Sequence, residues 1–296
     1  MTKDKRILFL GDSITAEGTF IAFLEAILLQ HFPGQGFTLI NIGVPSETAS
    51  GLTEGDHPFP RPCVHERIER ALLITKPDWV VLGYGMNDGI YSPFSQERFL
   101  AYQKGLLEAV RIVHSSGAKA IVMTPPAFDS SAIRQETLLA DGHHEQAYSY
   151  LTPYEHYNDV LKTYARWLLW QEGIADEVVN IYDPLLQARE NARMNDPDYR
   201  SGDGIHPHAD GHWVIAETLL RHLFEVRCKA TPPFVGQPES STFFQLVWQR
   251  QKVLSAAWKE HIGHSNPNKA TALPLEEALQ EGDKLAEQIK NHFSIS

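Results

Sequence analysis

Three short segments of the chain carry side chains that could perform nucleophilic catalysis. Ser13 lies in the segment GDS, Asn87 in the segment GMND, and Asp203 and His206 in the segment DGIH. A serine hydroxyl attacks a carbonyl carbon when a histidine accepts its proton and a carboxylate holds that histidine in the required tautomer. The side-chain N–H groups of an asparagine can stabilise the oxyanion that then forms. These four residues are therefore a candidate catalytic set.

Each segment also has an ordinary structural interpretation. Ser13 could cap the N-terminus of a following helix, and Asn87 could form an Asx turn. Asp203 and His206 could lie in a solvated surface turn. Taken singly, no segment decides between the two interpretations. Together they favour catalysis, because the sites of parallel α/β sheets form beyond the carboxyl ends of the strands, where these segments are expected.

Short apolar runs alternate with longer helical patterns along most of the chain. The runs are β-branched or aromatic and apolar throughout, which is typical of strands covered on both faces. This alternation predicts a parallel sheet with right-handed crossovers and helices on both faces. The predicted strands are Ile7–Leu10, Phe37–Val44, Trp79–Tyr84, Ala120–Met123 and Val178–Tyr182. The predicted helices are Phe20–His31, Val64–Leu73, Phe99–His114, Tyr154–Trp170 and Trp213–Phe224.

Four blocks in this order resemble the SGNH/GDSL hydrolase family, and they read GDSIT, NIGVPSETASG, GMND and DGIH. The resemblance covers roughly residues 6 to 225. It implies a flavodoxin-like three-layer α/β/α fold with a five-stranded parallel sheet, and neither a cofactor nor a metal. It also implies that Ser13 attacks an ester carbonyl, that His206 takes its proton and later protonates the leaving alcohol, and that Asp203 orients His206.

The second block departs from the family pattern. Its common form is N-x-G-x-S-G-(D/E)-T, in which the second glycine supplies a backbone N–H to the oxyanion. Here the block reads NIGVPSET and has Ser46 at that point. A backbone donor tolerates a side chain if the local φ and ψ allow one. The expected oxyanion hole is therefore made by the N–H groups of Ser13 and Ser46 and the side chain of Asn87, with Gly43 as the alternative to Ser46.

The composition of the chain changes near residue 229. We expect a hydrolase domain over residues 1–228 and, over 229–296, a linker followed by a helical hairpin. Thr231–Ser241 is rich in proline and reads as the linker. The hairpin is expected to be structural and outside the chemistry. It must bury its stripes on the domain or on a second copy of the chain, so a homo-oligomer is possible, or it could overhang the site and shape substrate choice. The stripes contain Phe243, Val247, Leu254 and Trp258, then Leu275, Leu279, Ala286, Ile289 and Phe293.

Bulk properties exclude several classes of protein. The 296 residues carry a formal net charge of −11, which argues against nucleic acid and anionic membranes as partners. No apolar stretch is long enough to span a membrane, and the N-terminus lacks the pattern of a signal peptide. We therefore expect a cytoplasmic protein, unless an export signal has been removed. Cys63 and Cys228 are expected to be free thiols, although a disulfide between them is possible.

Other candidate sites are weaker. His143 and His144 beside Asp141 could suggest a metal, as could His208 and His212 near His206, but neither group has recognisable ligand spacing. A solvated loop explains the first group, and the catalytic role of His206 explains the second better than a metal does. Glu47 and Asp88 are expected to support the loops. The remaining strand-end residues could line a pocket or lie exposed; they are Phe59, Arg61, Tyr91 and Phe128.

The substrate is the least determined feature. The segment from Ser50 to Pro62 is polar, contains prolines and has an aromatic residue near its tip, which suits a small acyl group on a polar alcohol such as a sugar. We expect an esterase that acts on O-acetyl groups of carbohydrate. The alternatives are an acyl hydrolase of the lysophospholipase or thioesterase type and a non-catalytic binding module on the same fold.

Overall fold

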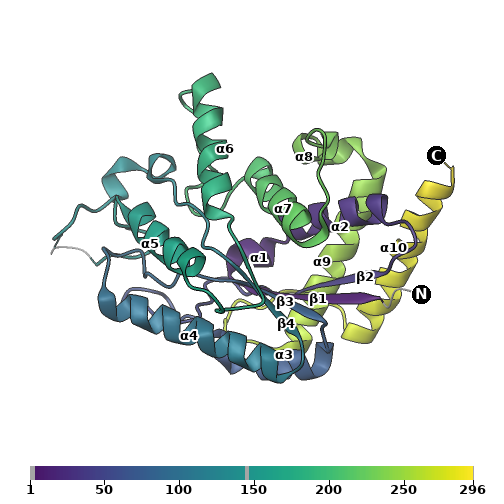
Figure 1. The fold of residues 1–296 in the computed structure, drawn as a ribbon, viewed down its shortest axis with the longest axis horizontal. Coiled ribbons are helices and arrows are strands. Elements are labelled where there is room, and N and C mark those ends of the chain that lie inside the picture. Colours follow the sequence, from purple (N-terminus) through teal and green to yellow (C-terminus); the bar gives the residue numbers. More distant parts are fainter. Residues whose placement is uncertain (1–3, 144–146, 296) are drawn as a thin grey trace.

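The computed structural model describes residues 4–143 and 147–295, with side chains described as far as His292. Five parallel strands form one sheet in the order β2-β1-β3-β4-β5 (Figure 1). This is the strand order of flavodoxin-like folds, and it confirms the predicted fold class. The strands are β1 (Lys5–Gly11), β2 (Phe37–Asn41), β3 (Trp79–Gly83), β4 (Lys119–Met123) and β5 (Glu177–Val179).

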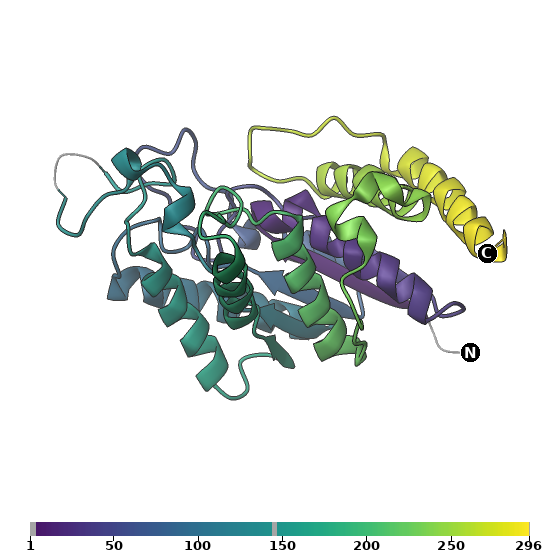
Figure 2. The same cartoon turned by 90° about the horizontal axis from the view of Figure 1, so that it is seen from above.

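Helices cover both faces of the sheet, as the continuous apolarity of the strands predicts (Figures 1 and 2). Alternate residues of β1 point to opposite sides, so Leu8 and Leu10 join one apolar cluster while Ile7 and Phe9 join the other. The first cluster packs on α3 (Ile68–Thr75), α4 (Gln96–Ser115) and α5 (Tyr157–Trp170). The second packs on α1 (Ser13–Glu17), α2 (Thr19–His31) and α7 (Ala209–Phe224).

The carboxyl ends of β1 and β3 lie side by side, because Gly11 pairs with Gly83 in the parallel register. Glycine is required at the end of β1, since a Cβ on Gly11 would lie 2.2 Å from Thr15 Oγ1 and 2.8 Å from Gly83 O. The missing side chain lets α1 fold back against the end of the sheet. The first residue of α1 is thereby held beside the loop that follows β3.

Several predicted boundaries were wrong. Strand β2 ends at Asn41 rather than Val44, although Ile42 and Val44 still donate backbone hydrogen bonds to β1. Strand β5 stops at Val179 rather than Tyr182, because the chain turns at Asn180 and Ile181 and helix α6 (Tyr182–Asn195) begins at Tyr182. Helix α6 was not predicted. Its only buried side chains are Tyr182 and Leu185, so it carries almost no apolar stripe, and it projects from the body of the molecule (Figure 1).

Short helical turns account for other differences. The predicted helix Val64–Leu73 is a 3₁₀ turn, η1 (Val64–Glu66), followed by α3. The segment after β4 contains two more such turns, η2 (Ser130–Ala132) and η3 (Gln135–Thr137). The proline-rich segment predicted as a linker contains α8 (Pro233–Gly236) and η4 (Pro238–Ser240). This segment packs on the molecule, since Phe234 is buried and its ring stacks on Phe244 at 4.7 Å between centroids.

Helix α9 (Thr242–Ile262) lies along the β2 edge of the sheet and contributes to both apolar clusters. Phe243, Phe244 and Val247 join the α2 and α7 side, whereas Leu254 and Trp258 join the α3 and α4 side. The four residues predicted as its apolar stripe are all buried. A helix that spans both clusters closes the core at the edge strand, where unpaired backbone groups would otherwise be open to another chain.

A buried polar contact also joins α9 to α2. Arg250 Nη1 lies 2.5 Å from Glu25 Oε1, and Gln251 Nε2 donates to Glu25 Oε2 at 2.6 Å. The Gln251 amide lies 3.5 Å from Leu39 O of β2 as well. Burial raises the pKa of Glu25, and the charge of Arg250 opposes that rise. The contact therefore fixes α9 to a carboxylate that has lost most of its water.

The last helix, α10 (Leu275–Ile295), runs antiparallel to α9, so that Phe243 stacks on His292 and Leu254 lies against Gly282 (Figure 2). Its buried stripe is Ala278, Gly282, Leu285 and Ile289. Leu279 was predicted in the stripe but is 41% exposed, because it lies one position away from the face that α9 covers. Leu275 and Ala286 are partly buried, and the side chain of Phe293 lies outside the described residues.

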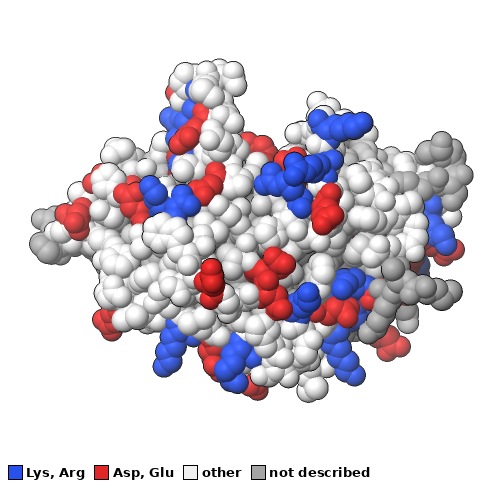
Figure 3. Space-filling model, viewed as in Figure 1, with Lys and Arg blue, Asp and Glu red and all other residues white. Residues whose placement is uncertain are grey.

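Three observations bear on the class of protein. Within residues 4–143 and 147–295, no helix combines the length and apolar character that a membrane span requires. The face shown in Figure 3 carries acidic and basic side chains interspersed rather than one continuous basic surface. Cys63 and Cys228 are both free thiols.

Candidate active site

The start of α1 places the serine hydroxyl at the carboxyl end of β1. Asp12, not Ser13, caps the helix, because Asp12 Oδ1 accepts a hydrogen bond from the Ile14 N–H at 3.0 Å. The capping interpretation of the serine is therefore wrong. With the cap supplied by its neighbour, Ser13 directs its hydroxyl to His206, and Ser13 Oγ lies 2.8 Å from His206 Nε2.

The loop that carries Asp203 and His206 folds the carboxylate onto the imidazole. Asp203 Oδ2 lies 2.9 Å from His206 Nδ1, while Asp203 Oδ1 accepts the backbone N–H groups of Ile205 and His206 at 2.9 and 2.7 Å. Gly202 permits this closure. It has a φ of 59°, and a Cβ there would lie 1.7 Å from His206 O. The structure thus brings the serine, histidine and aspartate of the predicted set into one hydrogen-bonded chain.

The charges along the hydrogen bonds from Ser13 to Asp203 favour His206 as the base that accepts the proton of Ser13. The hydrogen bond to Asp203 raises the pKa of His206 against the opposing effect of burial. Burial also acts against ionisation of Asp203, but hydrogen bonds from the His206 ring and backbone hold the pKa of the carboxyl well below its usual range. Asp203 is therefore ionised across the neutral range, and it stabilises the protonated imidazole that proton transfer would create.

The second block forms a tight turn beside α1. The Glu47 N–H donates to Val44 O at 3.2 Å, Pro45 follows Val44, and Ser46 has a φ of 65°. Proline at the second position of a turn and a positive φ at the third define a type II turn, which favours glycine at the third position. Ser46 therefore occupies a backbone conformation that favours glycine, the residue that the SGNH/GDSL pattern commonly has at this point.

The two candidate donors of this block differ in availability. The Gly43 N–H already donates to Asn41 Oδ1 at 2.9 Å. Glycine is needed at position 43 for space, since a Cβ would lie 2.3 Å from Ala16 N of α1. The Ser46 N–H makes no hydrogen bond to any described part of the chain. The geometry therefore favours Ser46 over Gly43 as a donor to a bound oxyanion.

Asn87 links the loop after β3 to this turn. Its Nδ2 donates to Glu47 O at 3.1 Å, and its Oδ1 accepts the Tyr91 hydroxyl at 2.9 Å. An Asx turn would use the backbone of the residues that follow Asn87, so the long-range contact to Glu47 does not fit that alternative. The amide has two N–H groups. The bond to Glu47 uses one of them, and the second is available to a ligand.

Glu47 and Asp88 support the loops, as expected. Glu47 is fully buried and accepts two hydrogen bonds from Arg67, at 2.6 and 2.5 Å, and one from the Tyr84 hydroxyl at 2.6 Å. Asp88 Oδ1 accepts the backbone N–H groups of Ala49 and Ser50 at 2.9 and 2.7 Å. Breaking a buried, hydrogen-bonded ion pair is strongly destabilising, so these contacts fix the loop on which the turn sits.

Arg61 is not an exposed loop residue. Its guanidinium pairs with Glu54 through two contacts of 2.5 Å, and both side chains are 2% exposed. It also lies over the Tyr91 and Tyr150 rings, at 5.7 and 5.9 Å from their centroids, and its Nη1 donates to Ser46 O at 3.3 Å. No motif in the sequence indicates the pairing of Arg61 with Glu54. Among the other pocket candidates, Phe128 is buried and Phe59 is partly buried.

Asp12 was not predicted as a site residue, although an aspartate directly before a helix is a common cap. It is 3% exposed, and burial raises its pKa to about 7, with the charge of His206 opposing the rise. Asp12 and His206 therefore lie close enough for each charge to affect the ionisation of the other.

The other histidines that the structure describes form no metal site. His212 is buried, stacks on the Phe20 ring at 6.1 Å, and has its Nε2 3.2 Å from Glu17 Oε2. Over the described ranges, no cluster of three or more His, Cys, Asp or Glu side chains is placed to hold a metal ion. His144 lies outside the described residues.

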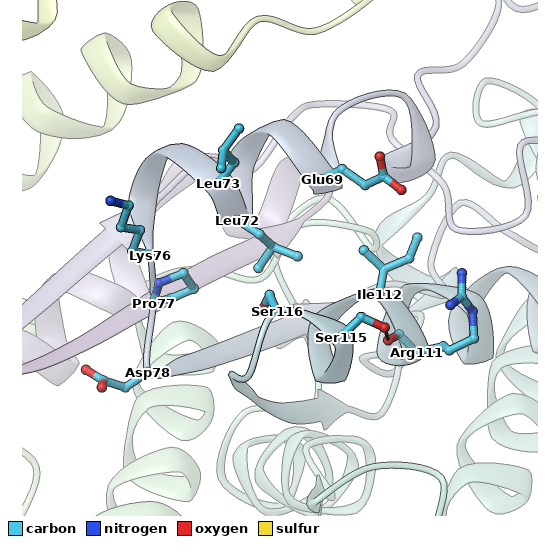
Figure 4. A pocket seen from close by; sticks show the side chains of 10 residues that line it. All are labelled: Glu69, Leu72, Leu73, Lys76, Pro77, Asp78, Arg111, Ile112, Ser115 and Ser116. Atoms are coloured by element: carbon cyan, nitrogen blue, oxygen red, sulfur yellow. Dashed lines mark hydrogen bonds between the residues drawn. The ribbon is translucent and has the colours of Figure 1, made fainter.

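A hollow of about 610 Å³ between α3 and α4 lies elsewhere on the molecule (Figure 4). Its lining includes Lys76, Pro77 and Asp78, which directly precede β3, together with Ser115 and Ser116 before β4. These residues belong to the amino ends of the strands. The hollow is therefore at the amino ends of the strands, whereas Ser13 is at their carboxyl ends, and the hollow takes no part in the candidate site.

Comparisons with known proteins identify the family and agree with the fold. The sequence profile of the GDSL-like Lipase/Acylhydrolase family matches residues 9–214. An acetylxylan esterase of Geobacillus stearothermophilus is 22% identical over 240 residues, which are 74% of this chain and 94% of that protein. The crystal structure of a catalytic mutant of an acetylxylan esterase from the same organism has a TM-score of 0.51 and 20% identity, covering 75% of this chain and 95% of that one. The structure of a gut microbial diltiazem-metabolizing enzyme also has a TM-score of 0.51, at 18% identity. The match covers 75% of this chain but only 47% of that enzyme.

Proposed function

The chain belongs to the GDSL-like lipase/acylhydrolase family and is a carboxylic ester hydrolase, and from this premise we propose that it removes O-acetyl groups from carbohydrate through an acyl-enzyme on Ser13. The observation that carries the proposal is the hydrogen-bonded chain from Ser13 Oγ through His206 to Asp203. A serine aligned with a base that is itself oriented by a carboxylate is the arrangement that nucleophilic acyl transfer needs.

The first half-reaction forms the acyl-enzyme. His206 Nε2 takes the Ser13 hydroxyl proton as Oγ bonds to the ester carbonyl carbon, and the carbonyl oxygen becomes the oxyanion. The N–H groups of Ser13 and Ser46 and the second N–H of Asn87 donate to that oxygen. The tetrahedral intermediate then breaks its bond to the alcohol oxygen, which receives the proton from His206 and leaves as the free sugar hydroxyl.

The second half-reaction regenerates the enzyme. A water molecule gives its proton to His206 Nε2 as its oxygen bonds to the acyl carbon, and the same donors hold the second oxyanion. The acyl–Oγ bond then breaks, Oγ takes the proton back from His206, and acetic acid is released and ionises in water. Asp203 keeps its negative charge throughout and holds the imidazole in place.

Two observations support a small acyl group on a polar alcohol. The relatives named above include acetylxylan esterases that resemble most of this chain. The loop between the turn and η1 carries the Arg61–Glu54 pair beside the aromatic rings of Tyr91 and Tyr150. Of these side chains Tyr150 alone is partly exposed, so its ring, held beside the buried pair, is the one that could contact the C–H face of a sugar.

Labelling with a serine-directed organophosphonate tests the mechanism. We expect mass spectrometry to find the label on Ser13, and Ser13→Ala to lose both the label and turnover of p-nitrophenyl acetate. Ser115→Ala is the matched control, because Ser115 lies at the end of α4, near the amino ends of the strands, and its Oγ donates to Arg111 O. A label on another residue of the active enzyme would overturn the assignment, and a wild type without turnover would support a binding module.

A substrate series tests the specificity separately. Acetylated xylooligosaccharides should give a higher kcat/KM than p-nitrophenyl esters of eight or more carbons, because the proposed site takes a short acyl group. A kcat/KM that rises steadily with acyl length would instead assign an acyl hydrolase of the lysophospholipase or thioesterase type, without affecting the role of Ser13.

A further inference from the structure

Three consecutive backbone carbonyls of the second block each accept a hydrogen bond from a side chain that lies far away in the sequence. The three donors come from the loop before η1, the loop after β3, and the connection between α9 and α10. They are Asn266 Nδ2 to Pro45 O (2.9 Å), Arg61 Nη1 to Ser46 O (3.3 Å) and Asn87 Nδ2 to Glu47 O (3.1 Å).

The contact from Asn266 acts on the peptide unit that contains the proposed oxyanion donor. Pro45 O and the Ser46 N–H belong to the same peptide group, and in a trans peptide they point in opposite directions. A donor that holds Pro45 O on the outer side of the turn therefore directs the Ser46 N–H the other way. Asn266 reaches this carbonyl over 221 positions in the sequence.

The Pro45–Ser46 peptide could adopt either of two orientations. Type I and type II turns differ mainly in the direction of their central peptide, which here joins Pro45 and Ser46. Serine favours a negative φ at the third position and hence type I, whereas type II requires the left-handed region that Ser46 occupies with a φ of 65°. In a type I turn, the Ser46 N–H would face the N–H₂ of Asn266, donor against donor. Asn266 therefore opposes the flip that the serine side chain favours.

The surroundings of Asn266 fix its amide in the donating orientation. Asn266 is 1% exposed, and its Oδ1 accepts the backbone N–H of Asn268 at 2.8 Å, so Nδ2 is the group that faces Pro45 O. The connection that carries it, residues 263–274, extends beyond the helix pair (Figure 2). It is tied back to α9, because Glu260 Oε1 accepts the Ala270 N–H at 2.9 Å.

We propose that Asn266 is a positioning residue for catalysis, which holds the Pro45–Ser46 peptide so that the Ser46 N–H serves the oxyanion hole. The inference rests on the proposed function. It gives the C-terminal segment a part in the chemistry, where the sequence predicted an element outside the chemistry. It also explains how a serine can stand in a position that usually needs glycine, since an added donor replaces the conformational freedom that glycine would have.

Substitution by aspartate is the sharpest test. Asn266→Asp keeps the size of the side chain and its acceptor for Asn268, but it replaces the donor with an oxygen that repels Pro45 O and accepts an N–H. The turn should then flip. We expect kcat to fall by roughly tenfold to a hundredfold, up to the loss that follows removal of a whole oxyanion donor, while KM stays within about twofold. Asn268→Asp is the matched control, since it adds the same charge to an exposed residue of the same loop.

A double-mutant cycle separates positioning from a merely structural role. Asn266→Ala removes the donor, and its effect on kcat is measured with serine and with glycine at position 46. Glycine holds the type II turn without help, so the loss should be at least about tenfold with serine and less than about threefold with glycine. Melting temperatures of all variants are recorded in parallel, because a purely structural loss would be the same in both backgrounds.

The outcomes are distinct. Equal losses in the two backgrounds, or an Asn266→Asp variant as active as Asn268→Asp, would overturn the proposal and leave the role of Ser13 intact. If Asn266→Asp does not fold, the comparison of Asn266→Ala with its glycine double variant still decides. Full activity of Ser13→Ala would instead overturn the proposed function itself.

Discussion

His206 and Asp203 are joined by two hydrogen bonds, one from the ring Nδ1 to Oδ2 at 2.9 Å and one from the backbone N–H to Oδ1 at 2.7 Å. The carboxylate therefore fixes the main chain of the histidine as well as its ring. Because both bonds close within one four-residue loop, the distance between the base and Ser13 depends on this loop as a unit. The ring contact raises the pKa of His206, and the backbone contact helps to lower the pKa of Asp203.

The pH dependence of the reaction should report His206. The imidazole accepts a proton only when neutral, so kcat/KM should rise with pH, with a midpoint above the ordinary histidine value of about 6.5. Asp12→Asn removes a nearby carboxylate that favours the protonated ring and keeps the cap, so its midpoint should lie lower than that of the wild type. Profiles of both proteins check this. Glu97→Gln, in the first turn of α4, is the control, and identical midpoints for Asp12→Asn and wild type would contradict the prediction.

Asn87→Ala should lower kcat by roughly a hundredfold to a thousandfold, the usual loss when one oxyanion donor is removed. Steady-state kinetics with p-nitrophenyl acetate measure the effect. Tyr91→Phe provides a milder comparison, because it removes the hydroxyl that orients Asn87 Oδ1 but keeps the amide donor. A loss as large for Tyr91→Phe as for Asn87→Ala would argue that the loop, and not the donor, is what the reaction needs.

Ser46→Gly should stabilise the protein by about 1 kcal/mol. A non-glycine residue in the left-handed region costs roughly 1–3 kcal/mol, and the greater freedom of glycine in the unfolded chain offsets part of the gain. Urea unfolding measures the change. Ser116→Gly is the matched control and should destabilise, since Ser116 has an ordinary φ of −82°. A Ser46→Gly variant less stable than wild type would mean that the serine side chain makes a favourable contact of its own.

Arg250→Ala should lower the free energy of unfolding by about 3 kcal/mol, the low end of the range for removing one member of a buried pair, because Gln251 still donates to Glu25. The kcat of the folded fraction should not change. Arg111→Ala breaks the exposed pair with Glu108 and should cost less than about 1 kcal/mol. Equal costs for the two variants would show that the contact between α9 and α2 contributes no more than a surface pair.

The positions of the strands could be predicted from the sequence more accurately than helix α6 and the strand ends. All five strands were found, because a strand covered on both faces is apolar throughout and needs no long-range information to identify. Helix α6 was missed for the opposite reason, since it buries only Tyr182 and Leu185. The end of β2 was placed too late because the residues up to Val44 stay apolar and still bond to β1 after the regular ladder stops.

In the candidate site too, residues with a nearby sequence signal could be predicted, and a residue that depends on a long-range contact could not. Ser13, Asn87 and His206 each follow a sequence signal that lies within a few residues of them. The positive φ of Ser46 has a local signal too, in the proline that precedes it. Asn266 has none, because its partner lies 221 positions away and the loop that carries it has no motif. The contact of Asn266 with Pro45 O depends on how α9 and α10 pack against the core, and a local sequence pattern does not show that packing.

Helix α9 is synthesised long after β1 and β2, yet both apolar clusters are incomplete without it. At about 5–20 residues per second, the ribosome adds α9 many seconds after β1 and β2, so the β2 edge has no cover while it waits. A nascent chain at that stage exposes the β2 edge and the apolar side chains of both clusters that α9 later covers, and molecular chaperones bind surfaces of this kind. Synthesis of this enzyme should therefore depend more on chaperones than synthesis of a relative whose core closes within its own sheet and helices.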